Sequence, residues 1–549
     1  MIPSAADLLK DLTAPRTGNT IEVVQAKNGQ PVARRNGRYV DSSHDPEAAA
    51  RRRLTGLALE GRRLAVVFGD GFGYLARQLV AAGLDVLLIE ADPDLPLAGY
   101  RALGHAAWAG FALSFCADSQ EAGFWEARIR PDLQAPDVLV VPPAAGADPC
   151  LVQAAKTLVE SLRRRMIDFE TTAWFGPQWV INILANLAVL QADSGRVLSP
   201  ASLPMGGDWV IAVPGPGLDE VLPELAGMRK GCTLLALAPA VKALRAAGLE
   251  PDLVCSSDGG WANRLHLAGE NLPGVPLVFP LMLAAGIAHA WAGPLVPVST
   301  GTALERQVVS GLPPMGETPS VALFALGIAI ACRAGRIVLA GQDFASYSCK
   351  THARGYRFDE DLLRSACRAA PVEKHLDMTW RRRDRMVSGW RADPKMFLYR
   401  ERLLELGRTM RLPLFRLGSS PFLDAIPAFP GDWRAGLVGR SVRAEWQIQD
   451  TVLRDWLARL AGVVGTEVWG TVSGPGDGKD RHMEEEEALL ALIRDGSLKP
   501  LFELGQAPIL RQVLLGRPVD GLPDPRPWLR RVVRRLGILL NNPAGDADR

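Results

Sequence analysis

Apolar runs of five or six residues, each ending in a glycine-rich turn that leads into a helical pattern, are the feature that most restricts the fold. Arg63–Phe68 is followed by Gly69–Gly73, and Trp209–Val213 is followed by Pro214–Gly217. Continuous apolar runs of this length are typical of strands buried on both faces, as in a parallel sheet covered by helices. The two series predict an α/β protein with two tandem doubly wound, Rossmann-like domains.

Further strands and helices extend both series. Strands are expected at residues 85–89 and 137–141 in the first series, and at 233–238, 253–257, 276–281, 295–298 and 337–340 in the second. The first 60 residues or so are expected to be polar and then helical, with Asp45 as N-cap and Pro46 at the first helical position. Residues 351–393 are polar and basic, which indicates a long excursion from the second sheet.

Three domains are therefore expected. Residues 1–195 form an N-terminal Rossmann-like domain that ends in a helical stretch, and residues 196–430 form a second Rossmann-like domain. Residues 431–549 have a helical pattern and form a mostly helical C-terminal domain.

The composition is that of a folded globular protein with nearly balanced charge. Of the 549 residues, 62 are basic and 60 acidic, and this balance argues against a nucleic-acid partner.

The seven cysteines contain no C-x-x-C pair, which favours a reducing compartment and does not indicate a zinc site. No signal peptide is recognisable, and Val321–Cys332 is shorter than the ~20 residues of a membrane span. We expect a cytoplasmic protein without a membrane partner.

The N-terminal turn Gly69–Gly73 stands between a strand and a helix, and Glu90 ends the next strand. Glycines permit close backbone approach to a ligand, and an acid at that strand end can accept hydrogen bonds from ribose hydroxyls. The turn could therefore hold a nucleoside. It could equally be a tight βα turn without a ligand, and the sequence leaves both alternatives open.

The second turn, Gly215-Pro216-Gly217, also follows a strand and opens a helix. Backbone N–H groups and the positive end of a helix dipole suit a phosphate, although a purely structural turn is the alternative. Polar residues end other strands of this series, and the carboxyl ends of parallel strands share one edge where ligands bind. The predicted nucleotide-binding residues are Gly215, Pro216, Gly217, Ser257, Asp258, Glu317, Thr318, Ser320, Gly341 and Gln342. Thr318 is the expected N-cap of the apolar helix, with Pro319 after it.

Asp258, Asp343 and His352 are the predicted catalytic residues. Imidazole titrates near neutrality, so His352 could act as a general base, or it could simply be a solvated loop residue. The arginine cluster at Arg381–Arg385 could bind an acidic sugar or phosphate, or be a solvated surface. The seven histidines show no H-x-x-x-H spacing, so the sequence does not indicate a metal site made of histidines.

The order and spacing of these motifs resemble the Maf (motility-associated factor) flagellin glycosyltransferases, which share a domain with archaeal hydroxymethylpterin pyrophosphokinase-like proteins. The resemblance covers roughly residues 20–430. It rests on Asp41–Pro46, Phe68–Tyr74, Trp174–Trp179 with Asn182 and Asn186, Gly215–Leu218, Ala246–Val254 with Asp258, Gly341–Phe344, and Thr351–Ala353.

The resemblance implies transfer of a nonulosonic acid, of the pseudaminic or legionaminic type, from a CMP-activated donor to Ser or Thr of flagellin. It implies that residues 196–430 form a catalytic domain similar to bacterial sialyltransferases and that the C-terminal helices contact the acceptor. Asp258 would face the ribose or a metal, Asp343 would position the sugar or support the base, and His352 would be the base. The chain departs from the sialyltransferase pattern at Gly217, where that pattern has Ser, and near Ser388–Trp390, which lacks the expected His.

Two other functions stay open. One is pyrophosphoryl transfer to a pterin alcohol with Asp258 and Asp343 as Mg²⁺ ligands, because this ion favours carboxylates and substrate phosphates. The other is a non-catalytic flagellin-binding chaperone. No cofactor beyond a CMP-sugar substrate and possible Mg²⁺ is implied, and the oligomeric state is not predicted.

Overall fold

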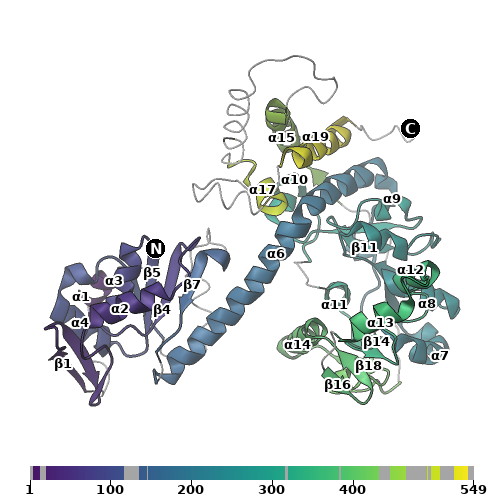
Figure 1. Ribbon diagram of the computed structural model, residues 1–549. Coiled ribbons are helices and arrows are strands. Elements are labelled where there is room, and N and C mark those ends of the chain that lie inside the picture. The colour runs from purple at the N-terminus through teal and green to yellow at the C-terminus, as the bar shows by residue number, and fades with distance from the viewer. Residues whose placement is uncertain are drawn as a thin grey trace. The chain divides into compact units, whose positions relative to one another are not determined.

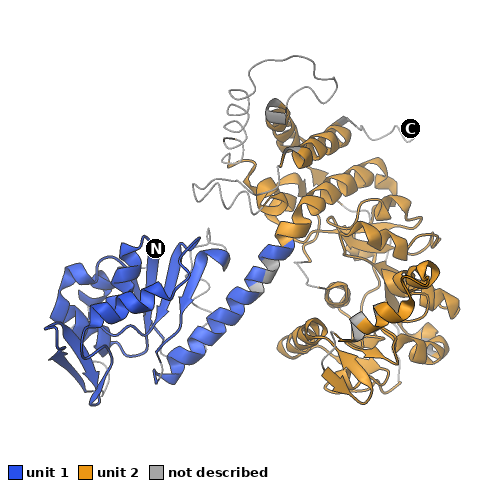
Figure 2. Cartoon of the chain, viewed as in Figure 1, with its two compact units in different colours: residues 1–171 blue, residues 172–549 orange. Residues whose placement is uncertain are grey.

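The chain divides into two compact units, residues 1–171 and 172–549 (Figure 2). The computed structural model describes residues 4–10, 12, 20–116, 135–144, 146–315, 320–381, 385–431, 445–464, 491, 496–506 and 525–541. Helix α6 (Pro149–Ala192) contributes residues to both units. The domain boundaries expected at residues 195 and 430 stay predictions.

The first unit contains a four-stranded parallel sheet in the order β6-β5-β4-β7 (Figure 1). The strands are β4 (Leu64–Phe68), β5 (Asp85–Glu90), β6 (Ala112–Phe115) and β7 (Val138–Val141), and α3 (Tyr74–Ala81) and α4 (Asp94–Leu103) connect them. One face buries Leu75 and Leu79 of α3. The other face packs on Leu151 and Leu158 of α6. Because apolar residues cover both faces, the uninterrupted apolar strands are explained.

A small antiparallel sheet precedes this fold, formed by β1 (Ile21–Gln25), β2 (Pro31–Arg35) and β3 (Arg38–Tyr39). The prediction of a polar and then helical first segment was wrong here. Asn28-Gly29 and Asn36-Gly37 separate the strands, and such pairs favour hairpin turns. Helix α2 (Pro46–Thr55) begins as predicted, because Asp45 Oδ1 accepts a hydrogen bond from Ala48 N–H at 2.8 Å.

The second unit contains a seven-stranded parallel sheet in the order β12-β11-β10-β9-β8-β14-β18. Its strands are β8 (Asp208–Ala212), β9 (Thr233–Leu237), β10 (Leu253–Cys255), β11 (Leu277–Pro280), β12 (Leu295–Val298), β14 (Arg336–Ala340) and β18 (Leu414–Leu417). The connecting helices are α7 (Leu218–Met228), α8 (Val241–Ala246), α9 (Ile287–Ala290), α10 (Ala303–Val308), α11 (Val321–Ala331) and α14 (Pro394–Thr409). Large apolar clusters lie on both faces of the sheet, so the predicted doubly wound arrangement is confirmed.

The polar excursion after β14 is ordered where the structure describes it. It contains α12 (Arg357–Ser365), α13 (Val372–Arg381) and a three-stranded sheet of β15 (Ser346–Tyr347), β17 (Trp390–Ala392) and β16 (Arg385–Val387). Trp390 is buried and stacks on Tyr347 with 4.8 Å between the ring centroids. The excursion is therefore anchored by its own small sheet.

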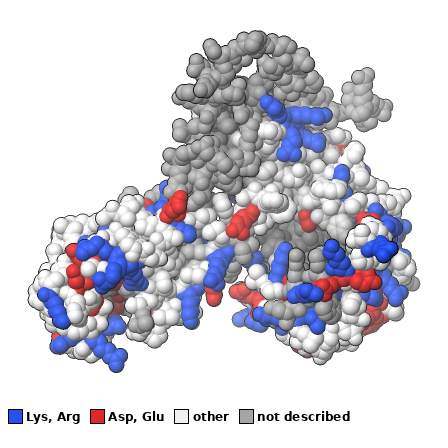
Figure 3. All heavy atoms as spheres, viewed as in Figure 1, with Lys and Arg blue, Asp and Glu red and all other residues white. Residues whose placement is uncertain are grey.

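Three helices of the C-terminal part lie within the described residues: α15 (Asp450–Val464), α17 (Lys499–Gly505) and α19 (Arg526–Asn541). Trp456 of α15 and Leu536 of α19 belong to the apolar core of the second unit. The solvent-facing side of α19 is basic, because Arg530, Arg531 and Arg534 are exposed and Arg535 is partly exposed. Figure 3 shows blue side chains gathered at the place that α19 has in Figure 1. Residues 465–490, 492–495 and 507–524 of the predicted helical domain lie outside the described residues.

Among the described residues, the helical segment Phe169–Ala192 is long and apolar enough to span a membrane. More than half of its most apolar 18-residue window is buried in the protein, at 56%. Asn182 and Asn186 of this segment are buried and donate hydrogen bonds to backbone carbonyls beyond β11. These contacts are those of a core helix.

Candidate functional site

The sheet of the second unit reverses its strand order next to β8. From β8 the chain adds β9 to β12 on one side and then returns to place β14 on the other. β8 and β14 are paired in parallel, with Ala212 opposite Ala340, so their carboxyl ends are adjacent. In open α/β sheets such a reversal creates a crevice where ligands bind. Gly215–Gly217 and Gly341–Asp343 both lie at this point, as predicted from strand-end positions.

The turn after β8 is tied directly to the end of β14. Gly215 N–H donates to Gly341 O at 2.9 Å, and Gly217 N–H donates to Asp343 Oδ2 at 2.7 Å. The Asp343 side chain is buried, and Ser420 Oγ donates to the Asp343 backbone carbonyl at 2.8 Å. The Gly217 N–H that was predicted to contact phosphate therefore has a carboxylate of the protein as its acceptor.

Close packing explains why glycine occupies both turn positions. A Cβ atom on Gly215 would lie 2.2 Å from Gly341 O and 2.4 Å from Asp343 Oδ2. A Cβ atom on Gly217 would lie 2.6 Å from Asp343 Oδ1. The serine of the sialyltransferase pattern could not fit at position 217 without moving this carboxylate. The position of the Asp343 side chain therefore explains why this chain has glycine there.

The environment of Asp343 makes it a titratable group near neutral pH. Burial raises the pKa of Asp343 to about 7, the hydrogen bond from Gly217 N–H opposes that rise, and the charge of Glu220 adds to it. A carboxylic acid with a pKa near the working pH can accept or release a proton efficiently. Asp343 therefore combines the position and the proton affinity that acid–base chemistry needs.

The strand end after β10 carries Ser256, Ser257 and Asp258. Ser256 is buried, Ser257 is partly buried and Asp258 is exposed. Asp258 Oδ1 accepts a hydrogen bond from Gly260 N–H at 2.8 Å, which orders the loop that follows. Asp258 thus presents a carboxylate to solvent at the edge of the sheet where the prediction placed it.

The loop that carries His352 is attached to the start of α7. Ala353 N–H donates to Pro214 O at 2.9 Å, and Arg354 N–H donates to Asp219 Oδ1 at 3.0 Å. Pro214 immediately precedes the Gly215 turn. The structure therefore brings the His352 loop against this turn, although the two are far apart in the sequence.

Tyr356, which the sequence did not indicate, organises the surroundings of His352. The two rings stack with 3.6 Å between centroids, and His352 Nδ1 lies 2.8 Å from Thr351 Oγ1 and 3.9 Å from Asp359 Oδ2. Tyr356 also contacts the buried ring of His266, with 5.1 Å between the ring centroids. Burial lowers the pKa of His266 to about 4, and the charge of Asp258 opposes this shift. His266 is therefore neutral at pH 7.

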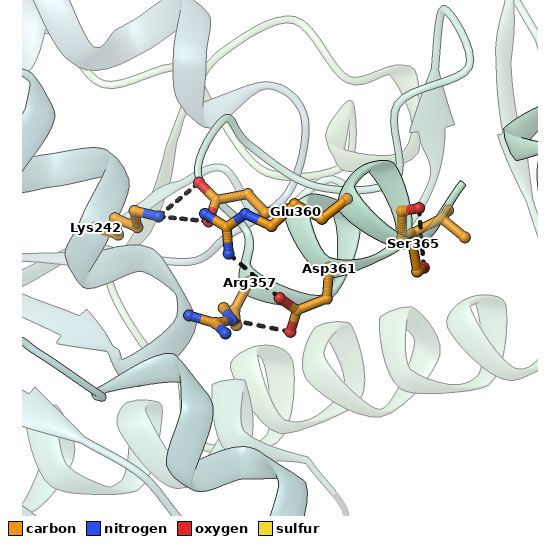
Figure 4. Close-up of polar contacts among 7 residues, drawn as sticks. Lys242, Arg357, Glu360, Asp361 and Ser365 are labelled. Carbon is orange, nitrogen blue, oxygen red and sulfur yellow. Dashed lines mark hydrogen bonds and ion pairs between the residues drawn. The ribbon is translucent and has the colours of Figure 1, made fainter. Parts of the chain in front are cut away.

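Ion pairs hold α12, which follows Tyr356 directly, against α8 (Figure 4). Lys242 Nζ of α8 lies 2.5 and 2.6 Å from the two carboxylate oxygens of Glu360. Within α12, Arg357 Nε donates to Asp361 Oδ2 at 2.9 Å. This pairing fixes the segment on which Tyr356, and through it His352, depends.

Replacing Lys242 by methionine is expected to destabilise α12 by less than about 1 kcal/mol, because the pair is partly exposed. The α12 amides should exchange hydrogen about two- to fivefold faster by mass spectrometry. The matched control is Arg381→Met, which removes the more exposed Arg381–Asp377 pair of α13 and should leave α12 unchanged. Equal exchange of α12 in both variants would show that the Lys242–Glu360 pair does not hold this helix.

Two asparagines of α6 support the loop between β11 and α9. Asn182 Nδ2 donates to Gly259 O at 2.9 Å and to Met282 O at 3.0 Å. Asn186 Nδ2 donates to Leu281 O and Leu283 O, both at 2.8 Å. Asparagines four residues apart within the otherwise apolar stretch Trp179–Leu190 of α6 are the sequence signal for this support, which positions the Asp258 loop from behind.

The remaining predicted site residues have different positions. Ser320 is the N-cap of α11 and accepts from Leu323 N–H at 3.3 Å, so the prediction of Thr318 as the N-cap was wrong, because the helix begins at Val321. Glu317 and Thr318 lie outside the described residues. Gln342 is buried, and its Oε1 atom has no hydrogen-bond partner. In the basic cluster, Arg381 is exposed and paired with Asp377. These residues stay predictions as ligand contacts.

Within the described ranges, no group of three or more His, Cys, Asp or Glu residues is placed to hold a metal ion. The predicted Mg²⁺ ligands, Asp258 and Asp343, differ in their surroundings, since one is exposed and the other is bound to Gly217. A magnesium ion held here would take oxygen ligands from substrate phosphates as well as from the protein.

Strand order and strand-end geometry define a Rossmann-like α/β protein whose second unit reverses its strand order beside β8, and comparisons with known proteins agree with this fold. Residues 182–348 match the family model described as 6-hydroxymethylpterin diphosphokinase MptE-like. The chain is also similar to the solved structure of the MAf glycosyltransferase from Magnetospirillum magneticum AMB-1. That similarity has a TM-score of 0.57 and 12% sequence identity, and it covers 97% of this chain and 92% of the other. No curated protein matches the sequence.

The two comparisons confirm the resemblance that the motifs indicated and the predicted fold class. The matched segment contains β8 to β15, and so includes the Gly215 turn, Asp258 and Asp343. At 12% identity the structural similarity establishes a shared fold.

Proposed function

We propose that this chain is a glycosyltransferase that moves a nonulosonic acid from a CMP-activated donor to a Ser or Thr hydroxyl of flagellin in the cytoplasm. The observation that carries the proposal is the reversal of strand order beside β8, where Asp343 meets the Gly215 turn and the His352 loop is attached. This crevice lies in the segment matched by the MptE-like family model, within a fold similar to that of a MAf glycosyltransferase.

The donor would lie along the carboxyl edge of the sheet, between the Gly215 turn and Asp258. The acceptor hydroxyl oxygen attacks the anomeric carbon, the bond from that carbon to the phosphate oxygen breaks, and CMP leaves. His352 or Asp343 receives the hydroxyl proton. The backbone dipoles at the starts of α7 and α11 would stabilise the charge on the departing phosphate.

The direct test incubates the chain with flagellin and CMP-activated pseudaminic or legionaminic acid and reads the acceptor by intact mass. We expect flagellin to gain the mass of one or more nonulosonic acid residues. His352→Ala and Asp343→Asn should slow this transfer by about a hundredfold or more if each handles the proton, whereas Asp377→Asn on the exposed face of α13 should not.

In calorimetry, Asp258→Ala should weaken CMP binding, and unchanged affinity would remove Asp258 from the site. Tight flagellin binding without a mass change, for any activated sugar tried, would instead favour a binding chaperone.

One observation favours a second function, since the matching family model describes a 6-hydroxymethylpterin diphosphokinase. The same crevice would then hold ATP and a pterin alcohol, with Asp258 and Asp343 near Mg²⁺. Incubation with ATP, Mg²⁺ and 6-hydroxymethylpterin, followed by mass spectrometry of the pterin, separates the two functions. Formation of the pterin diphosphate together with unmodified flagellin would overturn the glycosyltransferase proposal.

A further inference from the structure

A cavity of about 730 Å³ lies in the first unit, far in sequence from the proposed transfer site. Its wall includes the Gly69–Gly71 turn after β4, Glu90 at the end of β5, and Asp148 in the loop after β7. Strand β3 and the residues that follow it, from Arg38 to Ser42, also line the cavity. This volume is within the range of sites that hold small organic molecules, which is roughly 300–1,000 Å³.

The cavity occupies the point where the strand order of this sheet reverses. The chain moves from β4 to β5 and β6 on one side and returns to β7 on the other side of β4. The loops after β4 and β7 separate at that point and leave a crevice at the carboxyl edge. The first unit therefore has the same kind of ligand position as the second.

The inner wall presents acceptors. Glu90 Oε1 accepts hydrogen bonds from Asp70 N–H at 2.7 Å and Gly71 N–H at 3.1 Å, and Asp70 Oδ2 accepts from Ala76 N–H at 2.7 Å. These backbone N–H groups therefore already have carboxylates of the protein as their acceptors. A phosphate would find acids where a nucleotide-binding turn normally offers N–H groups.

Asp41 adds an unpaired acceptor to this wall. It lies against the turn, since a Cβ atom on Gly71 would be 2.6 Å from Asp41 Oδ1. The Asp41 Oδ2 atom is buried and has no hydrogen-bond partner. A buried polar atom without a partner costs free energy, which a ligand hydroxyl or N–H group would recover.

All three acids hold their protons unusually tightly. Burial raises the pKa of Asp41 to about 7, of Asp70 to about 6 and of Glu90 to about 8. The neighbouring carboxylates add to the rise for Asp41 and Glu90, while backbone hydrogen bonds oppose it for all three. The inner end of the cavity is therefore suited to hydrogen-bond donors and unsuited to anions.

The outer wall of the cavity carries basic and aromatic side chains instead of acids. Arg35 and Arg38 line it, and a guanidinium group binds phosphate well. Tyr39 lies beside them with 49% of its surface exposed. An exposed aromatic ring is a stacking surface for a base.

We propose that the first unit binds a ribonucleotide, with the ribose hydroxyls hydrogen-bonded to Asp41 and Glu90 and the phosphate facing Arg35 and Arg38. Tyr39 then stacks on the base. This orientation is the reverse of a phosphate on the glycine turn, and the arrangement of donors and acceptors dictates it. The proposal does not depend on the transfer activity proposed for the second unit.

Hydrogen-exchange mass spectrometry on the full chain tests the proposal and locates the ligand. The probes are AMP, CMP, GMP and UMP, each at millimolar concentration, with the 2′,3′-dideoxy form of any nucleotide that protects. We expect at least one nucleotide to slow exchange in residues 35–45, 69–76 and 146–151, and the dideoxy form to bind about tenfold more weakly or worse. Protection confined to the second unit would overturn the proposal, as would equal binding of the dideoxy form.

Two variants sharpen the result. Asp41→Asn keeps the shape of the side chain but changes an acceptor into a donor. The nucleotide should therefore protect these segments with an apparent affinity about tenfold lower. Glu60→Gln, an exposed acid outside the cavity, should bind as the unaltered chain does. Exchange of β4 and β5 without nucleotide shows whether Asp41→Asn is folded. If it is not, the dideoxy comparison on the unaltered chain decides alone.

Discussion

Alanine in place of Gly215 should abolish nucleotide binding in the second unit and lower the free energy of unfolding by about 1–3 kcal/mol, the usual cost of overpacking. The added Cβ atom would lie 2.2 Å from Gly341 O, a backbone atom that cannot rotate away. It would also lie 2.4 Å from Asp343 Oδ2. To relieve these contacts the ends of β8 and β14 must separate, which breaks the Gly215–Gly341 hydrogen bond. Urea unfolding and CMP calorimetry measure the two effects.

Gly227 provides the matched control on the helix that follows the turn. A Cβ atom there meets nothing within 4 Å, so Gly227→Ala should leave CMP binding unchanged and stabilise α7 by up to about 1 kcal/mol. If Gly215→Ala bound CMP like Gly227→Ala, the crevice beside β8 would not be the nucleotide site.

The second large effect is a loss of stability in the first unit as pH rises. Glu90 is buried, and its pKa rises from 4.5 to about 8. Between these values the folded chain holds a proton that the unfolded chain has released, so the free energy of unfolding decreases with pH. The slope approaches about 1.4 kcal/mol per pH unit for one such group. Asp41 and Asp70, whose pKa values are raised in the same direction, extend the effect over pH 4 to 8.

Glu90→Gln isolates this contribution, because the amide imitates the protonated acid and its oxygen can still accept from Asp70 N–H. The variant should show a flatter stability profile between pH 5 and 8, and above pH 8 the first unit should be more stable than in the unaltered chain. Pulse proteolysis in urea, followed through peptides of β4 and β5, reports this unit separately. The exposed acid of Glu60 serves as the control, and Glu60→Gln should keep the original slope. A first unit whose stability is constant or rises with pH would contradict the proton assignment.

Much of the fold could be predicted because buried parallel strands have a strong local signal. The apolar runs at Trp209–Val213 and Leu295–Val298 needed no knowledge of distant residues, and the structure places strands there within one residue. The small sheet at Ile21–Tyr39 was missed because its strands are short, half-exposed and without a long apolar run. Its Asn-Gly turns were the only strong local cue.

The candidate site was predictable as a set of positions. Strand ends of a parallel sheet share one edge, so Gly215 and Asp343 could be placed on the same edge from their positions at strand ends. The hydrogen bond from Gly217 N–H to the Asp343 carboxylate could not be predicted, because it depends on the packing of two loops 126 residues apart. Tyr356 was missed for a similar reason, since its stacking on His352 follows from the path of the loop after β15.

Gly217 N–H donates a hydrogen bond to the Asp343 carboxylate. This carboxylate therefore competes with any bound anion for the same N–H group. Any phosphate that uses this donor must first displace a tethered carboxylate, so the measured affinity includes the free energy of that displacement. The same tether re-forms when the anion leaves, which shortens the residence time of a nucleotide product at the turn. Acidification through the pKa of Asp343, about 7, weakens the competitor, because a protonated carboxyl group is a poorer acceptor for Gly217 N–H. For the anion binding proposed at the glycine turn, the affinity would therefore depend on the protonation state of Asp343.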